Sequence, residues 1–438
     1  MGTKNENYNQ ENNDIEKIPV IIAGLDYGNN PSFEHSMEEM EALVEACDME
    51  AVYVVVQSLN HPDPGTYMGS GKVMEIAALA EEVKAEYCIF EDNLSPAQLK
   101  NLQKMLGIEV WDRTNLILEI FSRRAQTLEA RLQVETAYLQ YMLPRLTGMW
   151  QHLGRQGGGS GSRSNRGIGE TQIELDRRQI NHRIAELRRE LDQIERTRAT
   201  QRSGRKKAGL PMVALVGYTN AGKSTIMNSM LSTGEVSDEK KVLQKDMLFA
   251  TLDTSIRHIS LGSNKDFLLS DTVGFIENLP HGLIKAFRST LEEAANADLL
   301  LIVLDASDPY CDQHKKVTED TLKELDAGEI PRLYVMNKAD LIADRSYKIP
   351  MVRDDTIWMN ATDPECIAEL MRFVSDRVYS SNCVCECIIP YSRGDLTDLL
   401  HRRANIINEE YTESGVKIVA EVTPDVYGLV KEFEISND

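Results

Sequence analysis

The segment Met212-Val-Ala-Leu-Val-Gly217-Tyr218-Thr219-Asn220-Ala221-Gly222-Lys223-Ser224-Thr225 decides the fold of the largest part of this chain. Its first part is continuously apolar, as expected of a buried parallel strand, and the residues after Thr225 have a helical pattern. The glycines let backbone amides converge on phosphate groups, helped by the positive end of the following helix. The segment therefore predicts a phosphate-binding loop (P-loop), in which Lys223 reaches the β- and γ-phosphates and the Ser224 hydroxyl ligates Mg²⁺.

A second motif, Asp271-Thr272-Val273-Gly274, follows another apolar strand at the distance expected after a P-loop. Asp271 is expected to hold Mg²⁺ through water, and the Gly274 amide to contact the γ-phosphate. Such a short motif occurs by chance at many strand ends, so the assignment depends on its distance from the P-loop. Together the two motifs predict a site that binds and hydrolyses a nucleoside triphosphate.

The third motif, Asn337-Lys338-Ala339-Asp340, decides which base is bound. The Asp340 carboxylate can accept two hydrogen bonds from N1-H and the exocyclic amine of guanine, and adenine offers neither in that arrangement. Asn337 and Lys338 are expected to brace the loop and cover the base. The amide of Ala361 is expected to reach the guanine oxygen, although Asn360 stands where GTPases commonly have serine. The sequence thus predicts a GTPase with GTP and GDP as ligands.

The segment between the P-loop and Asp271 should sense the γ-phosphate. Within Phe249-Ala250-Thr251-Leu252-Asp253, Thr251 is the best candidate to complete the Mg²⁺ shell when GTP is bound, with Thr254 and Ser255 as rivals. Loss of this ligation on hydrolysis would release the loop, which is how such proteins signal. The predicted metal ligands are therefore Ser224 and Thr251, and the predicted catalytic groups are Lys223, Thr251 and Gly274.

Phe275 stands where many GTPases place a glutamine that orients the attacking water. A phenylalanine cannot do this, so we expect slow intrinsic turnover and a partner or a cation that supplies the missing order. Asn220 is the residue type that coordinates K⁺ in cation-dependent GTPases. Two interpretations of Asn220 stay open, a K⁺ ligand or a brace within the loop.

The chain has 438 residues, too many for one ordinary core, and its patterns divide it into five parts. Residues 1–16 are polar and predict a disordered tail. Apolar runs at 20–25, 51–56, 87–90 and 108–111 alternate with helical stretches at 36–47, 71–85 and 95–106. This alternation predicts an α/β domain with a largely parallel sheet over residues 17–114.

Residues 115–207 predict an antiparallel helical hairpin. Ile180, Ile184, Leu187, Leu191 and Ile194 repeat as a helix seam, and Leu128, Leu132, Leu139 and Met142 offer a partner stripe. The glycine-rich run 154–169 predicts a flexible, arginine-bearing tip, and 202–207 a basic linker. The GTP-binding domain is expected over 208–379. A small α+β domain should follow over 380–438, with a strand, a helix over 396–411, a strand over 416–422 and a tail.

Charge and cysteine usage limit the partners. The formal net charge of −21 argues against general nucleic-acid binding, and neither DNA nor a membrane is expected. Residues 155–207 are the exception, because they are strongly basic in an acidic chain. Seven cysteines without a disulfide framework suit a reducing compartment, so we expect a cytoplasmic protein. We also expect it to be a monomer. Cys383, Cys385 and Cys387 alternate as on one strand face, which we favour over a metal site.

The sequences of several segments resemble those of the HflX-type ribosome-associated GTPases. The resemblance rests on the P-loop, on Phe249–Asp253, on Asp271–Phe275 and on three segments of the helical region. Those segments are Phe121-Ser-Arg-Arg-Ala-Gln-Thr-Leu-Glu-Ala-Arg-Leu-Gln-Val-Glu135, Leu143-Pro-Arg-Leu-Thr-Gly148 and Gly169-Glu-Thr-Gln-Ile-Glu-Leu-Asp-Arg-Arg178. Departures occur at Thr254-Ser-Ile256, where the family usually has Pro-Thr-Thr, at Ile168 in place of proline, and at Asn360.

The resemblance implies a GTPase that acts on the large (50S) ribosomal subunit, is stimulated there, and splits or rescues stalled ribosomes. It also implies that Phe249–Asp253 contact the nucleotide and that Thr251 and Ser224 bind Mg²⁺. The basic hairpin would then contact rRNA, as the charge count also favours. A second hypothesis is a nucleotide-dependent assembly factor in subunit maturation, for which hydrolysis is incidental.

Overall fold

The computed structural model describes residues 17–28, 32–146, 164–208, 210–233, 249, 255–260, 265–276, 283, 293–342 and 348–435. Within the helix at 164–208, side chains are described for 174–200. The predicted tail over residues 1–16 lies outside the described residues. The chain divides into two compact units, one of residues up to 123 with 144–175, the other of residues 124–143 with 176–438. Each unit is described by itself.

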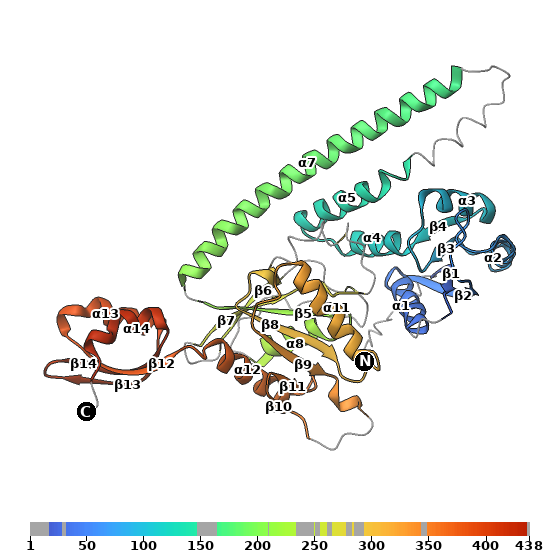
Figure 1. The fold of residues 1–438 in the computed structure, drawn as a ribbon. Coiled ribbons are helices and arrows are strands. Elements are labelled where there is room, and N and C mark those ends of the chain that lie inside the picture. The colour runs from blue at the N-terminus through green and yellow to red at the C-terminus, as the bar shows by residue number, and fades with distance from the viewer. Residues whose placement is uncertain are drawn as a thin grey trace, which may run out of the picture. The chain divides into compact units, whose positions relative to one another are not determined.

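The first unit is built on a parallel sheet with the strand order β2-β1-β3-β4 (Figure 1). Its strands are β1 Ile18–Asp26, β2 Met49–Ser58, β3 Tyr87–Phe90 and β4 Glu109–Asp112. Its helices are α1 Phe33–Ala46, α2 Ser70–Val83, α3 Pro96–Leu106 and α4 Arg113–Arg124, the last residue of which falls in the second unit. The α/β class and all four strands predicted from the sequence are confirmed.

Local chemistry explains where these elements stop. Helix α3 begins with a capping box, in which Ser95 and Gln98 satisfy each other's backbone amides, and Pro96 occupies its first turn. It ends at Gly107, which has a φ of 72°. Later in the chain, Arg145 donates to Asp112 Oδ2 at 2.9 Å and to the Leu94 carbonyl at 3.0 Å. The segment after α5 is thereby fixed to the end of β4.

Helices α5, Leu128–Met142, and α7, Ser164–Ala208, form the predicted hairpin. Arg183 pairs with Glu135 at 2.8 Å and Arg198 with Glu129 at 2.7 Å, so the two helices run antiparallel. The α7 seam is confirmed where it is buried, with Leu187 fully buried. The prediction that Leu128 belongs to the apolar stripe of α5 that packs against α7 is wrong, because this residue is 66% exposed.

Two other expectations for this region are wrong. Residues 164–169 were expected in a flexible tip, and 202–207 in a linker, yet both belong to α7. Each glycine costs a helix only about 1 kcal/mol, and a long run of arginine, glutamate and leucine propagates the helix past them. At 45 residues α7 is about 68 Å long. Residues 154–163 of the expected tip lie outside the described residues.

The second unit contains a sheet with the order β10-β11-β9-β8-β5-β7-β6 among its described residues. The strands are β5 Met212–Gly217, β6 Ser255–Ile259, β7 Phe267–Asp271, β8 Leu299–Asp305, β9 Arg332–Asn337, β10 Met351–Arg353 and β11 Thr356–Trp358. The helices are α8 Lys223–Thr233, α11 Cys311–Glu324, the short η1 Ala339–Leu341 and α12 Pro364–Val378. The strands β5, β7, β8, β9 and β11 are parallel, so their carboxyl ends meet at one edge.

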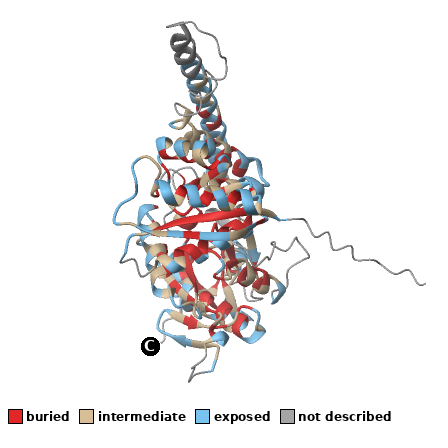
Figure 2. Ribbon diagram, turned by 90° about the vertical axis from the view of Figure 1, so that its right-hand side faces the viewer, coloured by how far each residue is buried: buried red, intermediate tan, exposed pale blue. Residues whose placement is uncertain are grey.

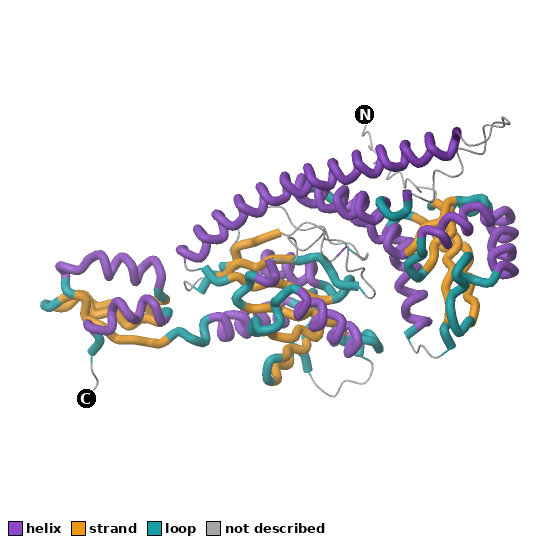
Figure 3. Tube along the Cα trace, turned by 45° about the horizontal axis from the view of Figure 1, so that its top comes forward, coloured by secondary structure: helices purple, strands orange, loops and turns teal. Residues whose placement is uncertain are grey.

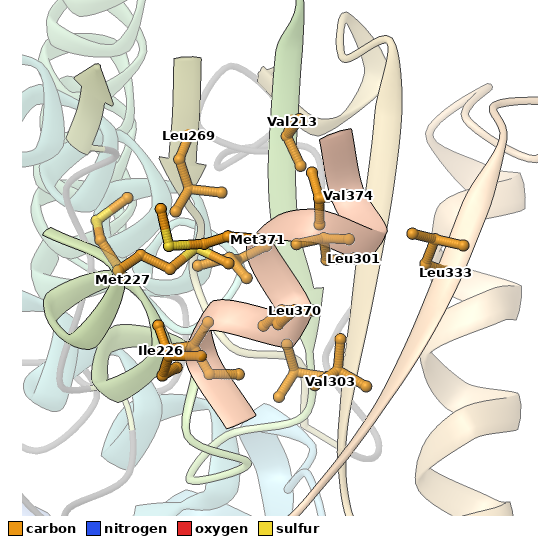
Figure 4. Packing of buried hydrophobic residues seen from close by; sticks show 14 of the residues in the cluster. Val213, Ile226, Met227, Leu269, Leu301, Val303, Leu333, Leu370, Met371 and Val374 are labelled. Carbon is orange, nitrogen blue, oxygen red and sulfur yellow. The ribbon is translucent and has the colours of Figure 1, made fainter. Parts of the chain in front are cut away.

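One face of this sheet is covered by α8 and α12 (Figure 4). Val213 and Leu301 from the sheet meet Ile226 from α8 and Leu370 from α12, and all four are fully buried. Figure 2 shows buried residues along the strands and exposed residues mainly on helices and loops. Truncating one such leucine to alanine should cost about 2–5 kcal/mol, so this core fixes the position of the P-loop helix.

The C-terminal part has an antiparallel sheet, β12-β14-β13, with both helices on one of its faces (Figure 3). Its elements are β12 Cys383–Ile389, a short 3-10 turn at Tyr391–Arg393, α13 Gly394–Arg403, β13 Asn405–Thr412, β14 Gly415–Val422, α14 Pro424–Val430 and a second 3-10 turn at Lys431–Phe433. The prediction of a strand face is confirmed for Cys385 and Cys387, which are buried in this core.

Two C-terminal expectations are corrected. The helix expected over 396–411 ends at Arg403, and residues 405–412 form β13 instead. Isoleucines at 406 and 407 favour a strand, and pairing with β14 satisfies its backbone groups. The expected tail after 422 contains α14, which starts with Pro424 in its first turn. No helix in the described part of the chain is long and apolar enough to cross a membrane.

Candidate nucleotide-binding site

The P-loop joins β5 to α8 at the carboxyl edge of the sheet. Gly217 has a φ of 147°, and a Cβ there would lie 2.2 Å from the carbonyl oxygen of Val303. Gly222 has a φ of 98°, and a Cβ there would lie 2.2 Å from Asn337 Nδ2. Only glycine fits both positions without moving its neighbours. Asn220, between them, is exposed and adopts a left-handed φ of 59°, which asparagine tolerates better than most residues.

Lys223, the first residue of α8, is turned back into the loop. Its Nζ donates to the carbonyl oxygens of Gly217 at 3.0 Å and Tyr218 at 2.7 Å. The residue is 6% exposed, and burial lowers the pKa of its ammonium to about 8, although the charge of Asp271 opposes this shift. A buried cation held by two carbonyls is suited to an anionic group such as a phosphate.

Ser224 and Asp271 meet at the place expected for the metal. The Ser224 hydroxyl donates to Asp271 Oδ2 at 2.7 Å, and Asp271 is fully buried at the end of β7. Pairing of β5 with β7 sets Asp271 opposite Leu215, and Thr272 is fixed by a 2.7 Å hydrogen bond to the Leu215 carbonyl. A hydroxyl and a carboxylate are hard oxygen donors of the kind that Mg²⁺ takes, so the donor set fits this ion.

The Asp271–Phe275 segment lies directly against the P-loop. The Phe275 amide donates to the Gly217 carbonyl at 3.0 Å, and the Thr219 amide donates to the Phe275 carbonyl at 2.8 Å. A Cβ on Gly274 would lie 2.8 Å from Thr219 Cγ2 and 3.0 Å from Lys223 Nζ, so this position requires a glycine. Phe275 itself is 5% exposed. Its side chain is thus packed inside, where it offers no group to a water molecule.

At the base end, Asn337 connects the P-loop to the loop before α12. Its Nδ2 donates to the Ala221 carbonyl at 2.9 Å, and its Oδ1 accepts from the Ala361 amide at 2.9 Å. Lys338 pairs with Asp305 at 2.8 Å. Asp340, in η1, is exposed, so its carboxylate is accessible to a base. These contacts agree with the bracing role expected for Asn337.

Asn360 has a structural role that the sequence did not indicate. Its Oδ1 accepts hydrogen bonds from the Thr362 amide at 2.9 Å and from the Thr362 hydroxyl at 2.8 Å. The asparagine therefore shapes the turn that leads into α12, in the manner of an Asx turn. Ala361, whose amide was expected to face guanine, is buried with its amide held by Asn337.

The predicted γ-phosphate sensor is placed only at its first residue. Phe249 is buried, with a φ of 54°. The structure does not describe the rest of this segment, residues 250–253, or the alternative candidate Thr254. The contacts on which a metal role for Thr251 depends therefore lie outside the described residues. Among the remaining predicted residues, Val273 and Ala339 are buried and Thr225 is half-buried in α8.

One contact of the site was missed by sequence reasoning. The ring of Tyr218 stacks on the imidazole of His314 in α11, with centroids 3.8 Å apart and an interplanar angle of 11°. Nothing in the pattern around His314 signals this, because the contact arises only when α11 packs on β5 and β8. In the described part of the chain, no group of three or more histidines, cysteines or acids is arranged to hold a metal ion.

A strand, P-loop and helix, with an Asp-Thr-Val-Gly segment against the loop and an Asn-Lys-Ala-Asp turn beside it, define the class of P-loop GTPases. Family models match the chain in three parts: GTP-binding GTPase N-terminal over residues 34–122, GTP-binding GTPase Middle Region over 124–205, and 50S ribosome-binding GTPase over 212–338.

Relatives named GTPase HflX match nearly the whole chain. The protein from Alkalihalophilus pseudofirmus is 40% identical over 96% of this chain and 97% of its own length. The protein from Caldanaerobacter subterraneus is 38% identical over 93% of this chain and 92% of its own length. The protein from Escherichia coli K12 is 39% identical over 86% of this chain and 87% of its own length. The chain belongs to the HflX family of GTPases. Among solved structures, the SsGBP and GDP complex has a TM-score of 0.48 at 23% identity, covering 83% of this chain and 99% of that one.

Proposed function

We propose that this GTPase is a nucleotide-controlled switch that docks on the large ribosomal subunit in the cytoplasm and acts in the splitting or rescue of stalled ribosomes. The observation that carries the proposal is the ion pair, within one compact unit, between Arg198 of the long helix α7 and Glu293 of the GTPase domain. The family model over 212–338, described as a 50S ribosome-binding GTPase, supports the choice of partner.

Guanine-nucleotide binding follows from the three motifs. Asp340 selects guanine, and Asn337, Lys338, Asn360 and Ala361 hold the loops around it. The P-loop amides and Lys223 receive the phosphates. In this proposal the Gly274 amide contacts the γ-phosphate, and Phe249–Asp253 are further contacts of the nucleotide.

Ser224 and Thr251 would hold Mg²⁺, and Asp271 would hold it through water. The ion would supply positive charge that stabilises the phosphate oxygens during hydrolysis. Lys223 contributes a second positive charge, because an anionic phosphate favours its protonated form. The buried Phe275 offers no hydrogen bond to the attacking water, so intrinsic hydrolysis is slow and depends on an added group. A K⁺ held by Asn220, or a ribosomal group, would supply it.

Arg198 connects the switch to the hairpin. It contacts Glu129 of α5 at 2.7 Å and Glu293 at 4.0 Å, and Glu293 is 2% exposed. Glu293 lies in the GTPase domain, between the Asp271–Gly274 motif and β8. Arg198 is therefore the contact through which we propose that the GTPase domain acts on α7.

The hairpin presents the basic segment 155–207 to rRNA, whose phosphates attract arginine and lysine. We further propose that the protein works as a monomer. The experiment that tests the proposal is sedimentation with ribosomes in GTP, GDP and a non-hydrolysable GTP analogue.

We expect nucleotide-dependent binding to large subunits and splitting of 70S particles with GTP or the analogue. Binding only to immature particles would replace this proposal with a role in subunit maturation. If the protein sediments with neither kind of particle in any nucleotide state, the ribosomal role is wrong.

A further inference from the structure

The stack between Tyr218 and His314 lies inside the phosphate end of the proposed site. Tyr218 is 5% exposed and His314 is 4% exposed, so both rings are held by protein on nearly all sides. Tyr218 is the second residue of the P-loop, and its carbonyl oxygen accepts from Lys223 Nζ at 2.7 Å. The position of this tyrosine therefore sets the position of an oxygen that holds the phosphate-binding lysine.

His314 is itself fixed by the turn between β8 and α11. Its Nδ1 lies 3.5 Å from Asp308 Oδ2. The Asp308 carboxylate also accepts from the Tyr310 amide at 2.8 Å, and the Tyr310 carbonyl accepts from the His314 amide at 3.0 Å. The imidazole is thus placed by the turn that leads into its own helix.

The same turn is attached to the base end of the site. The Ala306 amide donates to the Asn337 carbonyl at 2.8 Å, and Asp305 pairs with Lys338 at 2.8 Å. Asn337 in turn bonds to the P-loop carbonyl of Ala221. A closed ring of contacts therefore runs from the P-loop through His314 and the turn to Asn337 and back to the P-loop.

We propose that His314 is a positioning residue for the nucleotide, which acts through Tyr218 to hold the P-loop carbonyls around Lys223. This rests on the proposed nucleotide site and adds a residue on α11 that no motif contains. An aromatic stack of this kind is strong enough to change affinity by about 3- to 10-fold. Without it the loop must be ordered when phosphate binds, and the cost appears as weaker binding.

The test is a double-mutant cycle on GDP affinity, read with a fluorescent GDP analogue in the presence of Mg²⁺. We expect His314→Leu and Tyr218→Leu each to weaken binding by about 3- to 10-fold. The double variant should be little worse than either one, because both changes remove the same contact. His314→Phe keeps a ring and should bind within about 2-fold of the unchanged protein.

Lys316→Ala is the matched control, since Lys316 is exposed on the same helix. Unchanged affinity in both leucine variants, or losses that multiply in the double variant, would overturn the positioning role. Failure of His314→Phe to restore binding would do the same. If His314→Leu does not fold, Tyr218→Leu against Tyr218→Phe makes the same comparison. If the unchanged protein and Lys316→Ala do not bind GDP, the nucleotide site itself is wrong.

Discussion

The Ser224 hydroxyl lies 2.7 Å from Asp271 Oδ2 and donates a hydrogen bond to it, which joins the first turn of α8 to the end of β7. In the proposed function these two groups hold Mg²⁺, Ser224 directly and Asp271 through water. Ser224→Ala removes one oxygen and leaves the loop amides in place. We expect Mg²⁺ to tighten GDP binding to the unchanged protein by about 10- to 100-fold, and to have little effect on the variant.

The measurement is GDP affinity with Mg²⁺ and with a chelator. Ser232→Ala, at an exposed serine of the same helix, is the control and should keep the full gain. A Ser224→Ala variant that keeps it as well would show that this hydroxyl is not a metal ligand.

Asp340 decides the base in this account, and its exposed position in η1 leaves it free to pair with a ligand. Asp340→Asn replaces one carboxylate oxygen by an amide N–H donor, so the exocyclic amine of guanine loses its acceptor and faces a donor instead. We expect GTP binding to weaken by at least about 100-fold, and xanthosine triphosphate, which carries an oxygen in place of that amine, to bind better than GTP. Asp376→Asn, on the exposed side of α12, should change neither. Equal GTP affinity in both variants would refute the assignment of Asp340.

Burial of Lys223 predicts a pH dependence of nucleotide binding. The pKa of its ammonium is lowered to about 8 in the ligand-free protein, whereas a lysine in an unfolded chain titrates near about 10.4. Between these values the unfolded chain binds more protons, so the ligand-free protein gains stability as pH rises through this window. A bound phosphate needs the ammonium, so affinity should change in the opposite direction.

We expect GDP affinity to fall by about 4-fold between about pH 7 and about pH 8.5, a range in which guanine N1 remains protonated. Calorimetry at the upper pH, in buffers of different ionisation enthalpy, should show proton uptake on binding. Affinity and heat that do not depend on pH or buffer would mean that Lys223 is already fully protonated without ligand.

Arg198 balances two acidic side chains that are nearly buried, Glu129 and Glu293. Arg198→Ala leaves both without this partner, and we expect it to cost about 1–3 kcal/mol of stability in the second unit. Urea unfolding followed by circular dichroism measures this, with Arg196→Ala on the exposed side of α7 as the control. A midpoint that moves no more for Arg198→Ala than for the control would remove the link between α7 and Glu293.

Two interpretations of Asn220 remain, a K⁺ ligand or a brace of the P-loop. We favour the first in the proposed function, because Asn220 is exposed at the loop surface and Phe275 cannot order water. GTP turnover should then be faster in K⁺ than in Na⁺ at equal ionic strength, and Asn220→Ala should abolish the difference. Equal rates in the two salts would leave only the bracing role.

Much of the site could be predicted because its motifs are short, local and tied to the ends of strands. The residues from Gly217 to Ser224 determine the shape of their own loop, because two of its positions have a backbone conformation and a close neighbour that only glycine allows. The strands of the first unit were also predictable, because each is a compact apolar run between helical patterns. In both cases the local structure is determined by residues that are close together in the sequence.

The wrong predictions arose where residues outside the local pattern decide the structure. Residues 405–412 contain polar and charged residues that are compatible with an exposed helix, but they form a strand because they pair with β14. Residues 164–169 have the glycines of a loop, and the adjoining helix extends through them. The contact of His314 with Tyr218 could not be predicted, because it depends on how α11 packs against the sheet.

The central claim is that this GTPase is switched by the large ribosomal subunit through its basic hairpin. The most direct test is the rate of GTP hydrolysis with and without purified large subunits, measured at increasing salt. We predict stimulation of at least about 10-fold at low salt, falling steeply as salt rises, because contacts with rRNA phosphates release counterions. Equal rates with and without subunits, or a stimulation that salt does not weaken, would contradict the account.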